Sequence, residues 1–351
     1  MANPYGTKAP EQFWRNAVAT LHPNDVSPIP VKRFDLTQGT QVATAGSCFA
    51  QHLAQTLQSL AGIGFLQTEP SDPGQPLFSA AFGNIYTVAQ LRQLFDEAFS
   101  IRTPPPAAWI RADERWVDGY RPTMFADGFA DPESVFQARG QHLRAVRRMF
   151  TDCAVFVFTL GLTEGWLSTA GDAVFPLPPG LVTGKDSGPT ARFHNFSYQD
   201  IWDDLSHFVD ALRGVNPAVR IILTVSPVPL TATYTDEHVL VANTFSKSVL
   251  RAVCGQAEQT WPCVYYFPSF EIISGHYNNG GYYEPNKRTI APSGVAHVMR
   301  VFRMSYLRET PTARTTPGSV PHDSGSLLDR AFPRERPVIC DEEQFGTNVG
   351  F

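Results

Sequence analysis

The chain has 351 residues, a formal net charge of -5 and an apolar content of 43%, which is enough to form a hydrophobic core. Because there is no basic excess, the sequence lacks the phosphate-neutralising surface that nucleic-acid binding needs. No segment approaches the ~20 apolar residues that cross a bilayer, and the N-terminus has no apolar stretch of signal-peptide length. We therefore expect a cytoplasmic protein without a transmembrane segment.

The sequence predicts neither a cofactor nor a metal site. It contains no Gly-rich phosphate loop, no GxGxxG and no HExxH motif. Its five cysteines form an odd set without paired CxxC spacing, which argues against a disulfide framework and against zinc. We expect free, mostly buried thiols.

Apolar runs alternate with segments of helical period along the chain, which indicates a parallel sheet covered by helices on both faces. The five expected strands are residues 41–45, 62–66, 154–160, 220–225 and 264–267. The expected helices are residues 49–60, 87–99, 133–150, 198–212, 239–253 and 293–306, the last with Ser293 as its N-cap.

Two long insertions, residues 102–131 and 165–195, interrupt this rhythm and are rich in Pro, Gly and aromatic residues. The second is expected to begin as a hairpin over residues 166–175, where Gly-Asp forms the turn. Insertions of this kind serve either as substrate walls or as purely structural excursions. We expect one domain over residues 1–308. The remainder, 309–351, is rich in Pro, Thr, Ser and Arg and is expected to be a tail that contributes little to the core.

The most specific local feature is Gly46-Ser47, which joins the first expected strand to the first expected helix. A serine there lies at the carboxyl end of a strand and beside a helix N-terminus, whose N–H groups and dipole can stabilise an oxyanion. Ser47 is therefore a candidate nucleophile, and the alternative is a plain helix cap. Cys48 is a weaker candidate, because small apolar packing also explains it.

The segment Gly46-Ser47-Cys48-Phe49-Ala50 resembles the signature of the GSCFA family, a bacterial group related to SGNH/GDSL hydrolases. Residues 82–87, 224–228 and 246–248 resemble further blocks of that family, so the resemblance spans about residues 13–305. It implies a flavodoxin-like three-layer α/β/α sandwich. Together with the alternation of strands and helices, we expect five parallel strands in the order 2-1-3-4-5, with Ser47 and Gly161 on adjacent strand ends.

The resemblance also implies site residues. The oxyanion glycine corresponds to Gly83, with Asn84 beside it as a second possible donor, although Gly-Asn also forms plain turns. After the central strand, Thr163 stands where SGNH enzymes have an asparagine, so that a hydroxyl replaces the amide donor. Glu164 follows and either orients a base or contacts substrate, or is a solvated carboxylate.

The Asp-x-x-His block of SGNH enzymes is missing, since Ala291 stands where the histidine would be. A serine needs a neighbouring base, which must then come from elsewhere. His238, in the loop after the fourth expected strand, is the narrowly favoured candidate, and His276, after the last strand, is the alternate. For each of them an ordinary surface or capping role is the competing interpretation.

Two functions follow from these residues. The first is a serine esterase or O-acyltransferase acting on acyl esters, which by resemblance include bacterial glycan esters, through an acyl-enzyme on Ser47. The second is a non-catalytic glycan- or small-molecule-binding module that has lost its base. Its sugar platforms would be aromatic side chains of the insertions, namely Trp109, Trp116, Tyr120 and Trp166. The sequence leaves the oligomeric state undetermined.

Overall fold

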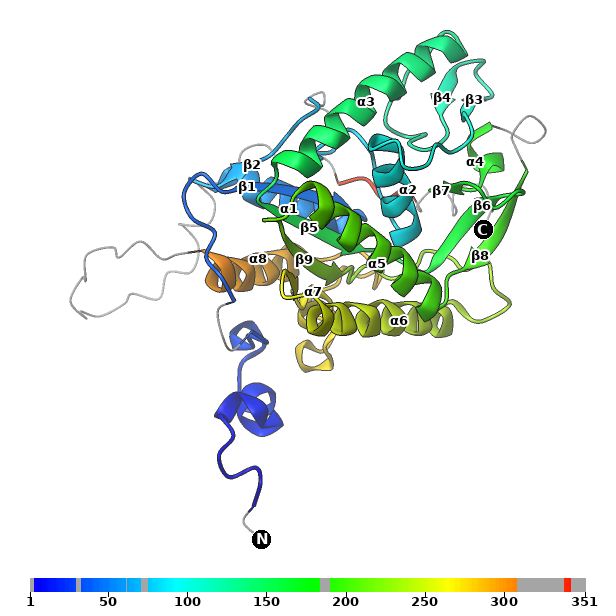
Figure 1. Cartoon of the computed structure of the whole chain (residues 1–351). Helices are drawn as coiled ribbons and strands as arrows, with labels where there is room; N and C mark the ends of the chain where they lie inside the picture. Colours follow the sequence, from blue (N-terminus) through cyan, green and yellow to red (C-terminus); the bar gives the residue numbers. More distant parts are fainter. Residues whose placement is uncertain are drawn as a thin grey trace.

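A computed structural model describes residues 3–29, 33–60, 62–70, 75–183, 190–307 and 338–341 of the chain. At its centre lies a sheet of five parallel strands in the spatial order β10-β9-β5-β1-β2 (Figure 1). Numbered among themselves along the chain, these strands have the order 2-1-3-4-5, which confirms the predicted topology. Their bounds are β1 Gln41–Gly46, β2 Gly64–Phe65, β5 Val155–Leu160, β9 Arg220–Val225 and β10 Val264–Tyr266.

The middle strand β5 is buried at every position, as its uninterrupted apolar sequence predicts for the centre of a parallel sheet. It pairs with β1 on one side, where Thr159 lies opposite Gly46, and with β9 on the other, where Leu160 lies opposite Val225. The carboxyl ends of β1, β5 and β9 therefore meet at one edge of the sheet. In such folds this edge, at the point where the strand order reverses, is where ligands bind.

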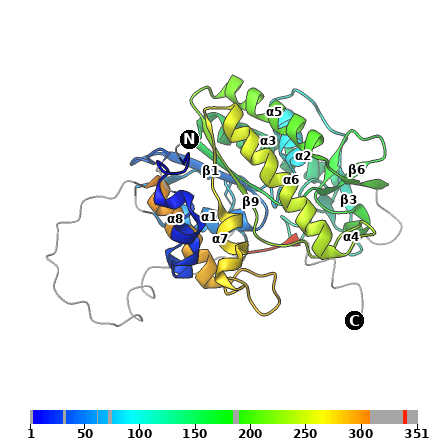
Figure 2. The ribbon, with the colours of Figure 1, turned by 90° about the horizontal axis from the view of Figure 1, so that it is seen from below.

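Two layers of helices cover the sheet and complete the predicted α/β/α sandwich (Figure 2). Helices α2, α3, α5 and α6 bury their apolar sides on one face, while α1, α7 and α8 pack on the other. Their bounds are α1 Phe49–Ser59, α2 Val88–Ala98, α3 Pro132–Asp152, α5 Tyr198–Val215, α6 Val239–Thr260, α7 Ser269–Ser274 and α8 Pro292–Tyr306. The described residues also contain short helical turns, which are η1 Pro10–Gln12, η2 Arg15–Ala19, η3 Pro23–Asp25 and η4 His276–Asn278.

Capping side chains explain where several helices begin. The Thr87 hydroxyl accepts from Gln90 N at the start of α2, and the Ser197 hydroxyl accepts from Asp200 N at the start of α5. The predicted cap at Ser293 is wrong. Helix α8 begins one residue earlier at Pro292, and Ala291 occupies the N-cap position without a side-chain hydrogen bond.

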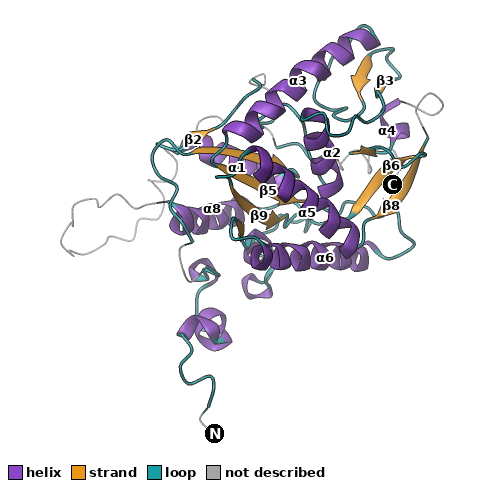
Figure 3. Cartoon of the chain, in the orientation of Figure 1, coloured by secondary structure: helices purple, strands orange, loops and turns teal. Residues whose placement is uncertain are grey.

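The two insertions form small antiparallel units on the same side of the molecule (Figure 3). The first contains β3 Ala108–Ile110 and β4 Trp116–Asp118, and the second contains β6 Glu164–Ser168, β7 Val174–Phe175, α4 Pro179–Thr183 and β8 Ala191–Asn195. Trp166 pairs with Phe175, which confirms the predicted hairpin. The insertions pack on each other, with the Trp109 and Phe175 ring centroids 4.9 Å apart.

No helix among the described residues combines the length and the apolar content that a membrane span needs. Within the same residues, no group of three or more His, Cys, Asp or Glu side chains is arranged to hold a metal ion.

Candidate active site

The turn after β1 presents Ser47 at the carboxyl edge of the sheet. Gly46 has a φ of +136°, a conformation that side chains disfavour, and a methyl group there would lie 2.7 Å from Thr159 N and closer still to its carbonyl oxygen. The Ser47 N–H donates to that same carbonyl oxygen at 3.1 Å. The side chain of Ser47 is buried, and its hydroxyl makes no hydrogen bond to any residue that the structure describes. An unpaired buried hydroxyl costs stability, so this serine calls for a functional explanation.

Gly161, which follows β5, contacts Ser47 as predicted. A methyl group at Gly161 would lie 3.1 Å from Ser47 Cβ and 3.0 Å from the Tyr86 carbonyl oxygen, so a side chain there would push the two turns slightly apart. The Gly161 N–H donates to Tyr86 O at 2.9 Å, and its own carbonyl accepts from the buried Lys247 Nζ at 2.5 Å. Lys247, on α6, therefore places a cation beside the turn that holds Ser47.

The loop with Gly83 and Asn84 runs along the other side of this turn. Ile85 N donates to Gly46 O at 2.8 Å, which ties the loop to the end of β1. Gly83 has a φ of +74° and so makes the turn that its sequence predicts. Both Gly83 and Asn84 thus lie next to the Ser47 turn.

An ionic cluster of Glu69, Arg121 and His142 packs against this loop. The Ala81 carbonyl accepts from Arg121, and the Ala81 N–H donates to Glu69, which also hydrogen-bonds to His142 Nδ1 at 2.6 Å. Burial lowers the pKa of His142 to about 4, and the contacts with His142 and Arg121 hold the pKa of Glu69 at about 2 despite its burial. At neutral pH the pair is therefore a neutral imidazole and a carboxylate.

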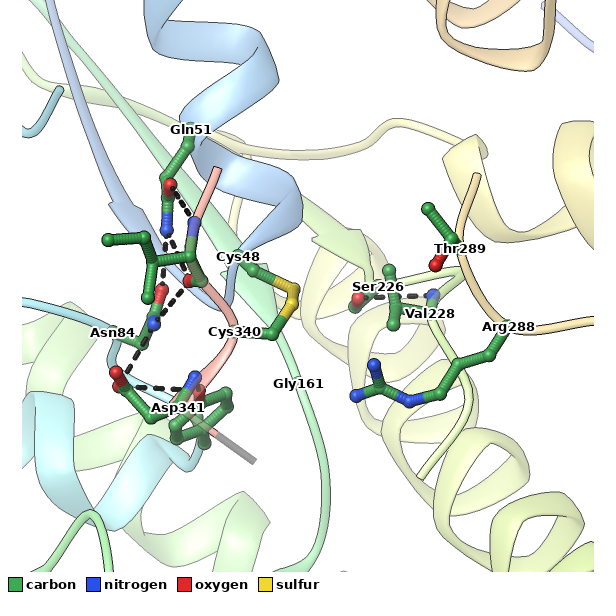
Figure 4. Close-up of a disulfide and its surroundings, with 12 residues drawn as sticks. Cys48, Gln51, Asn84, Gly161, Ser226, Val228, Arg288, Thr289, Cys340 and Asp341 are labelled. Atoms are coloured by element: carbon green, nitrogen blue, oxygen red, sulfur yellow. Dashed lines mark hydrogen bonds between the residues drawn. A yellow bond between two sulfur atoms is a disulfide. The ribbon is translucent and has the colours of Figure 1, made fainter. Parts of the chain in front are cut away.

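The side-chain amide of Asn84 is fully hydrogen-bonded (Figure 4). Its oxygen accepts from Gln51 Nε2 at 2.9 Å, and its nitrogen donates to Ile339 O and to Asp341 Oδ2, each at 2.9 Å. Two of its partners thus come from residues 338–341, which we call the C-terminal segment.

The C-terminal segment overturns the expectation about the cysteines. Cys340 forms a disulfide with Cys48, whereas the sequence suggested free thiols; Cys153, Cys254 and Cys263 are indeed free. Asp341 is buried against the Asn84 loop, while Val338 and Ile339 are exposed. That residues 309–351 contribute little to the core stays a prediction. The rest of 309–351 lies outside the described residues.

Thr163 and Glu164, which follow Gly161, hold the second insertion and a neighbouring loop. The Thr163 hydroxyl donates to Asn195 Oδ1 at 2.7 Å, so its proton is engaged away from Ser47. The Glu164 carboxylate accepts from the Thr233 hydroxyl and from Tyr234 N. Glu164 therefore anchors the neighbouring loop, and it also lines a cavity, so its contact with substrate stays a prediction.

The two candidate histidines have other contacts. His238 is the N-cap of α6, where its Nδ1 accepts from Leu240 N at 3.2 Å, and the ring of His276 stacks on Trp14. Because Ser47 Oγ has no hydrogen-bond partner in the described chain, no imidazole there is placed as its base. Arg288 and Thr289, from the stretch that corresponds to the missing Asp-x-x-His block, lie across from the disulfide (Figure 4).

A cavity of about 410 Å³ opens beside the site. Leu162, directly after Gly161, and Tyr86, whose carbonyl accepts from Gly161, are part of its wall. The remaining lining is mostly apolar or aromatic and includes Trp166, Leu181, Leu230 and Tyr234. Of the four aromatic residues proposed as sugar platforms, Trp166 lines this cavity, while Trp109 is buried and Tyr120 stacks on Phe175.

Sequence reasoning missed four polar residues of the site: Gln51, Tyr86, Lys247 and Asp341. Gln51 follows Ser47 by one helical turn, a spacing from which its place beside the site could have been inferred. Tyr86 and Lys247 lie in segments 82–87 and 246–248, which resemble family blocks, but their partners are far away in the chain and no role could be assigned to them. No local pattern marks Asp341.

A model described as "GSCFA family" matches residues 41–302 of the chain. No curated protein matches it. Among solved structures, a putative GDSL-like lipase from Parabacteroides merdae is 10% identical, with coverage of 77% of this chain and 97% of that chain and a TM-score of 0.34. A carbohydrate esterase family 3 protein from Talaromyces cellulolyticus is 10% identical, with coverage of 75% and 94% and a TM-score of 0.29.

A carbohydrate esterase family 2 enzyme with a carbohydrate-binding domain, from Corynascus thermopiles (Myceliophthora fergusii), is also 10% identical, with coverage of 77% of this chain and 67% of that chain and a TM-score of 0.28. At TM-scores this low we draw no conclusion about activity from these three structures.

Proposed function

This chain belongs to the GSCFA family, and we propose that it is a serine-dependent enzyme of SGNH type that handles acyl esters through Ser47. One observation carries the proposal: the Ser47 hydroxyl is buried without a hydrogen-bond partner among the described residues, on a turn that requires Gly46. The neighbouring turn of Gly161 leads to the cavity through Leu162. A purely structural serine at such a place would pair its hydroxyl.

In the proposed reaction Ser47 Oγ attacks the carbonyl carbon of the ester, and the hydroxyl proton passes to a base. The tetrahedral intermediate collapses, the alcohol leaves with a proton, and the acyl group stays on Ser47. Water then gives hydrolysis, whereas another hydroxyl compound gives acyl transfer, since both use the same acyl-enzyme. A glycan hydroxyl is one acceptor of this kind.

The candidate oxyanion donors are the Cys48 and Gly83 N–H groups and the Asn84 side-chain amide, which would first have to release the C-terminal segment. The Ser47 N–H already donates to Thr159 O and is therefore not a candidate. Cys48 lies directly before the first turn of α1, where the helix dipole favours negative charge. Donors from two different loops would thus meet the developing charge.

The role of general base stays a prediction for His238, with His276 as the alternate. His238 would have to release Leu240 N, and His276 would have to leave Trp14, before either ring could reach Ser47. Each is tested by replacing it with alanine. A true base should cost ester turnover on the order of 10²-fold or more.

The cavity favours a substrate with an apolar acyl or aromatic group. Its wall presents the faces and edges of Trp166, Tyr234 and several aliphatic side chains, and its one carboxylate, Glu164, is occupied by internal hydrogen bonds. Burying apolar substrate surface there is favourable by about 25 cal/mol per Å². The polar alcohol part of the ester would then lie outside the cavity.

Turnover of 4-nitrophenyl butyrate tests this proposal. Wild-type protein should release 4-nitrophenol, and Ser47→Ala should abolish the release without loss of stability, because no hydrogen bond to the described residues is lost. Ser59→Ala, at the exposed end of α1, is the matched control and should retain wild-type turnover. Equal turnover in Ser47→Ala would contradict the proposal.

The second candidate is a non-catalytic module that binds a small apolar or glycan ligand in the same cavity. The lack of an imidazole hydrogen-bonded to Ser47 in the described chain favours it. It predicts no turnover in wild type or variants, together with binding of butyrate esters that Trp166→Ala weakens in calorimetry.

A further inference from the structure

The C-terminal segment, residues 338–341, is joined to the turn of Ser47 across 292 positions of sequence. It lies at the carboxyl edge of the sheet, between α1 and the Asn84 loop (Figure 4). In Figure 1 it is the short red stretch inside the fold, far in sequence from every element that it touches. Cys340 binds the residue directly after Ser47, which places the segment on the site itself.

Specific contacts hold the segment. Ile339 exchanges a pair of hydrogen bonds with the Gln51 side chain, giving its N–H to Oε1 at 3.0 Å and accepting from Nε2 at 2.9 Å. Asp341 N donates to the Tyr86 hydroxyl at 3.0 Å. Because its backbone pairs with two different elements, the segment is held in one defined position.

The segment also uses the donors that a substrate would need. An amide nitrogen has two protons, and both protons of Asn84 Nδ2 are directed to oxygens of the segment, the Ile339 carbonyl and the Asp341 carboxylate. If Asn84 is an oxyanion donor as proposed above, these two oxygens occupy the place of an ester carbonyl oxygen or its oxyanion. Asp341 is 3% exposed, so its carboxylate fills a formed site.

Ser47 is closed off in the same arrangement. Its side chain is 2% exposed, and Cys48, which would lie beside a bound ester, is engaged in the disulfide. The segment is part of the same chain, so its binding to the site is intramolecular, and the disulfide raises its effective concentration further by holding it directly beside Ser47. After reduction the peptide chain alone connects the segment to the domain, so the segment competes less strongly with a free substrate.

From these contacts we propose that residues 338–341 are an autoinhibitory plug of the Ser47 site, locked by the Cys48–Cys340 disulfide and released by a thiol reductant. The inference rests on the proposed function of Ser47. In the release step, a thiolate of a dithiol attacks one sulfur of the disulfide, and its second thiol resolves the mixed disulfide. The protein gains two electrons and two protons as the Cys48 and Cys340 thiols, and the dithiol becomes a cyclic disulfide.

The reductant is a cellular dithiol of the kind that keeps cytoplasmic cysteines reduced. In a reducing compartment the site would be open, and oxidising conditions would close it. The predicted cytoplasmic location would therefore make the protein active by default and latent under oxidation.

The test follows the rate at which a fluorophosphonate labels the full-length protein, with and without dithiothreitol. Oxidised wild type should react about tenfold or more slowly than reduced wild type, given the effective concentrations that tethers produce. Cys340→Ser should react at the fast rate in both conditions. Cys263→Ser, which removes a half-buried free thiol, is the matched control and should behave like wild type.

Hydrogen exchange of the peptide that contains Ile339 and Asp341, whose backbone N–H groups donate to Gln51 and Tyr86, is measured on the same samples and separates the two proposals. If exchange becomes faster on reduction but no state of the protein is labelled, the plug is supported and catalysis by Ser47 is refuted. Equal labelling rates and equal exchange before and after reduction, with the disulfide verified by mass, would overturn the plug. Free Cys48 and Cys340 thiols in air-oxidised protein would overturn the lock.

Discussion

Replacing Gly46 by alanine should destabilise the protein by about 2–6 kcal/mol. Two terms contribute. Holding a non-glycine residue at the φ of +136° costs about 1–3 kcal/mol. The new methyl group would overlap the carbonyl oxygen of Thr159 and lie 2.7 Å from its nitrogen, and overpacking against a neighbouring strand costs another ~1–3 kcal/mol.

The overlap also bears on the site, because Thr159 O is the acceptor of the Ser47 N–H. The strands β1 and β5 would have to separate at the point where they hold the candidate nucleophile. We therefore expect Gly46→Ala to lose Ser47 reactivity together with stability. Native domains are stable by only about 5–15 kcal/mol, so the variant would be close to unfolding.

Urea unfolding followed by far-UV circular dichroism measures the effect. Gly214→Ala is the matched control, since Gly214 lies near the end of α5 and a methyl group there would meet nothing within 4 Å. It should gain roughly 0.5–1 kcal/mol from improved helix propensity. A Gly46→Ala variant as stable as wild type would refute the geometry of the turn.

Three further predictions concern the groups around the site. Reduction of the disulfide, or Cys340→Ser, should lower the free energy of unfolding by about 2–5 kcal/mol in urea titrations, because the bond closes a loop over 292 positions; no change would show that the segment is undocked. Lys247→Met should lower it by about 1–3 kcal/mol, since Gly161 O loses its donor, while unchanged stability and reactivity would refute this role. The pKa of His142 is lowered from 6.5 to about 4 by burial, so the unfolded chain takes up a proton first as the pH falls, and His142 should account for a loss of about 2 kcal/mol of stability between pH 7.5 and 5. Burial lowers the pKa of His52 in the same way, so the wild-type loss should be larger than this; His142→Gln should reduce the slope by its own share, and an unchanged slope would refute this role.

The sheet could be predicted from sequence because four of its strands lie in mainly apolar runs that alternate with helices of clear period, while β2 is only Gly64–Phe65. Strand β5, buried throughout, is the plainest case. The contact of Ser47 with Gly161 followed, since the carboxyl ends of adjacent parallel strands meet at one edge. A correct order of strands was thus sufficient to bring these two residues together.

The environment of Asn84 could not be predicted in the same way. Gln51, Ile339 and Asp341 reach it from α1 and from a short stretch near the C-terminus, and their pairing depends on the finished fold. The disulfide could not be predicted either, because Cys48 and Cys340 share no spacing motif. The prediction of Ser293 as the N-cap of α8 was wrong, because Pro292 fits the first helical position and the helix therefore begins one residue earlier.

The most direct test of the account is the position of a fluorophosphonate adduct on the reduced, full-length protein. Tandem mass spectrometry of the digested product should place the added mass on Ser47, and Ser47→Ala should show no adduct while unfolding at the same urea concentration as wild type or higher, since its buried hydroxyl has no partner in the described chain. An adduct on another residue, or none on reduced wild type, would contradict the assignment of Ser47 as the nucleophile.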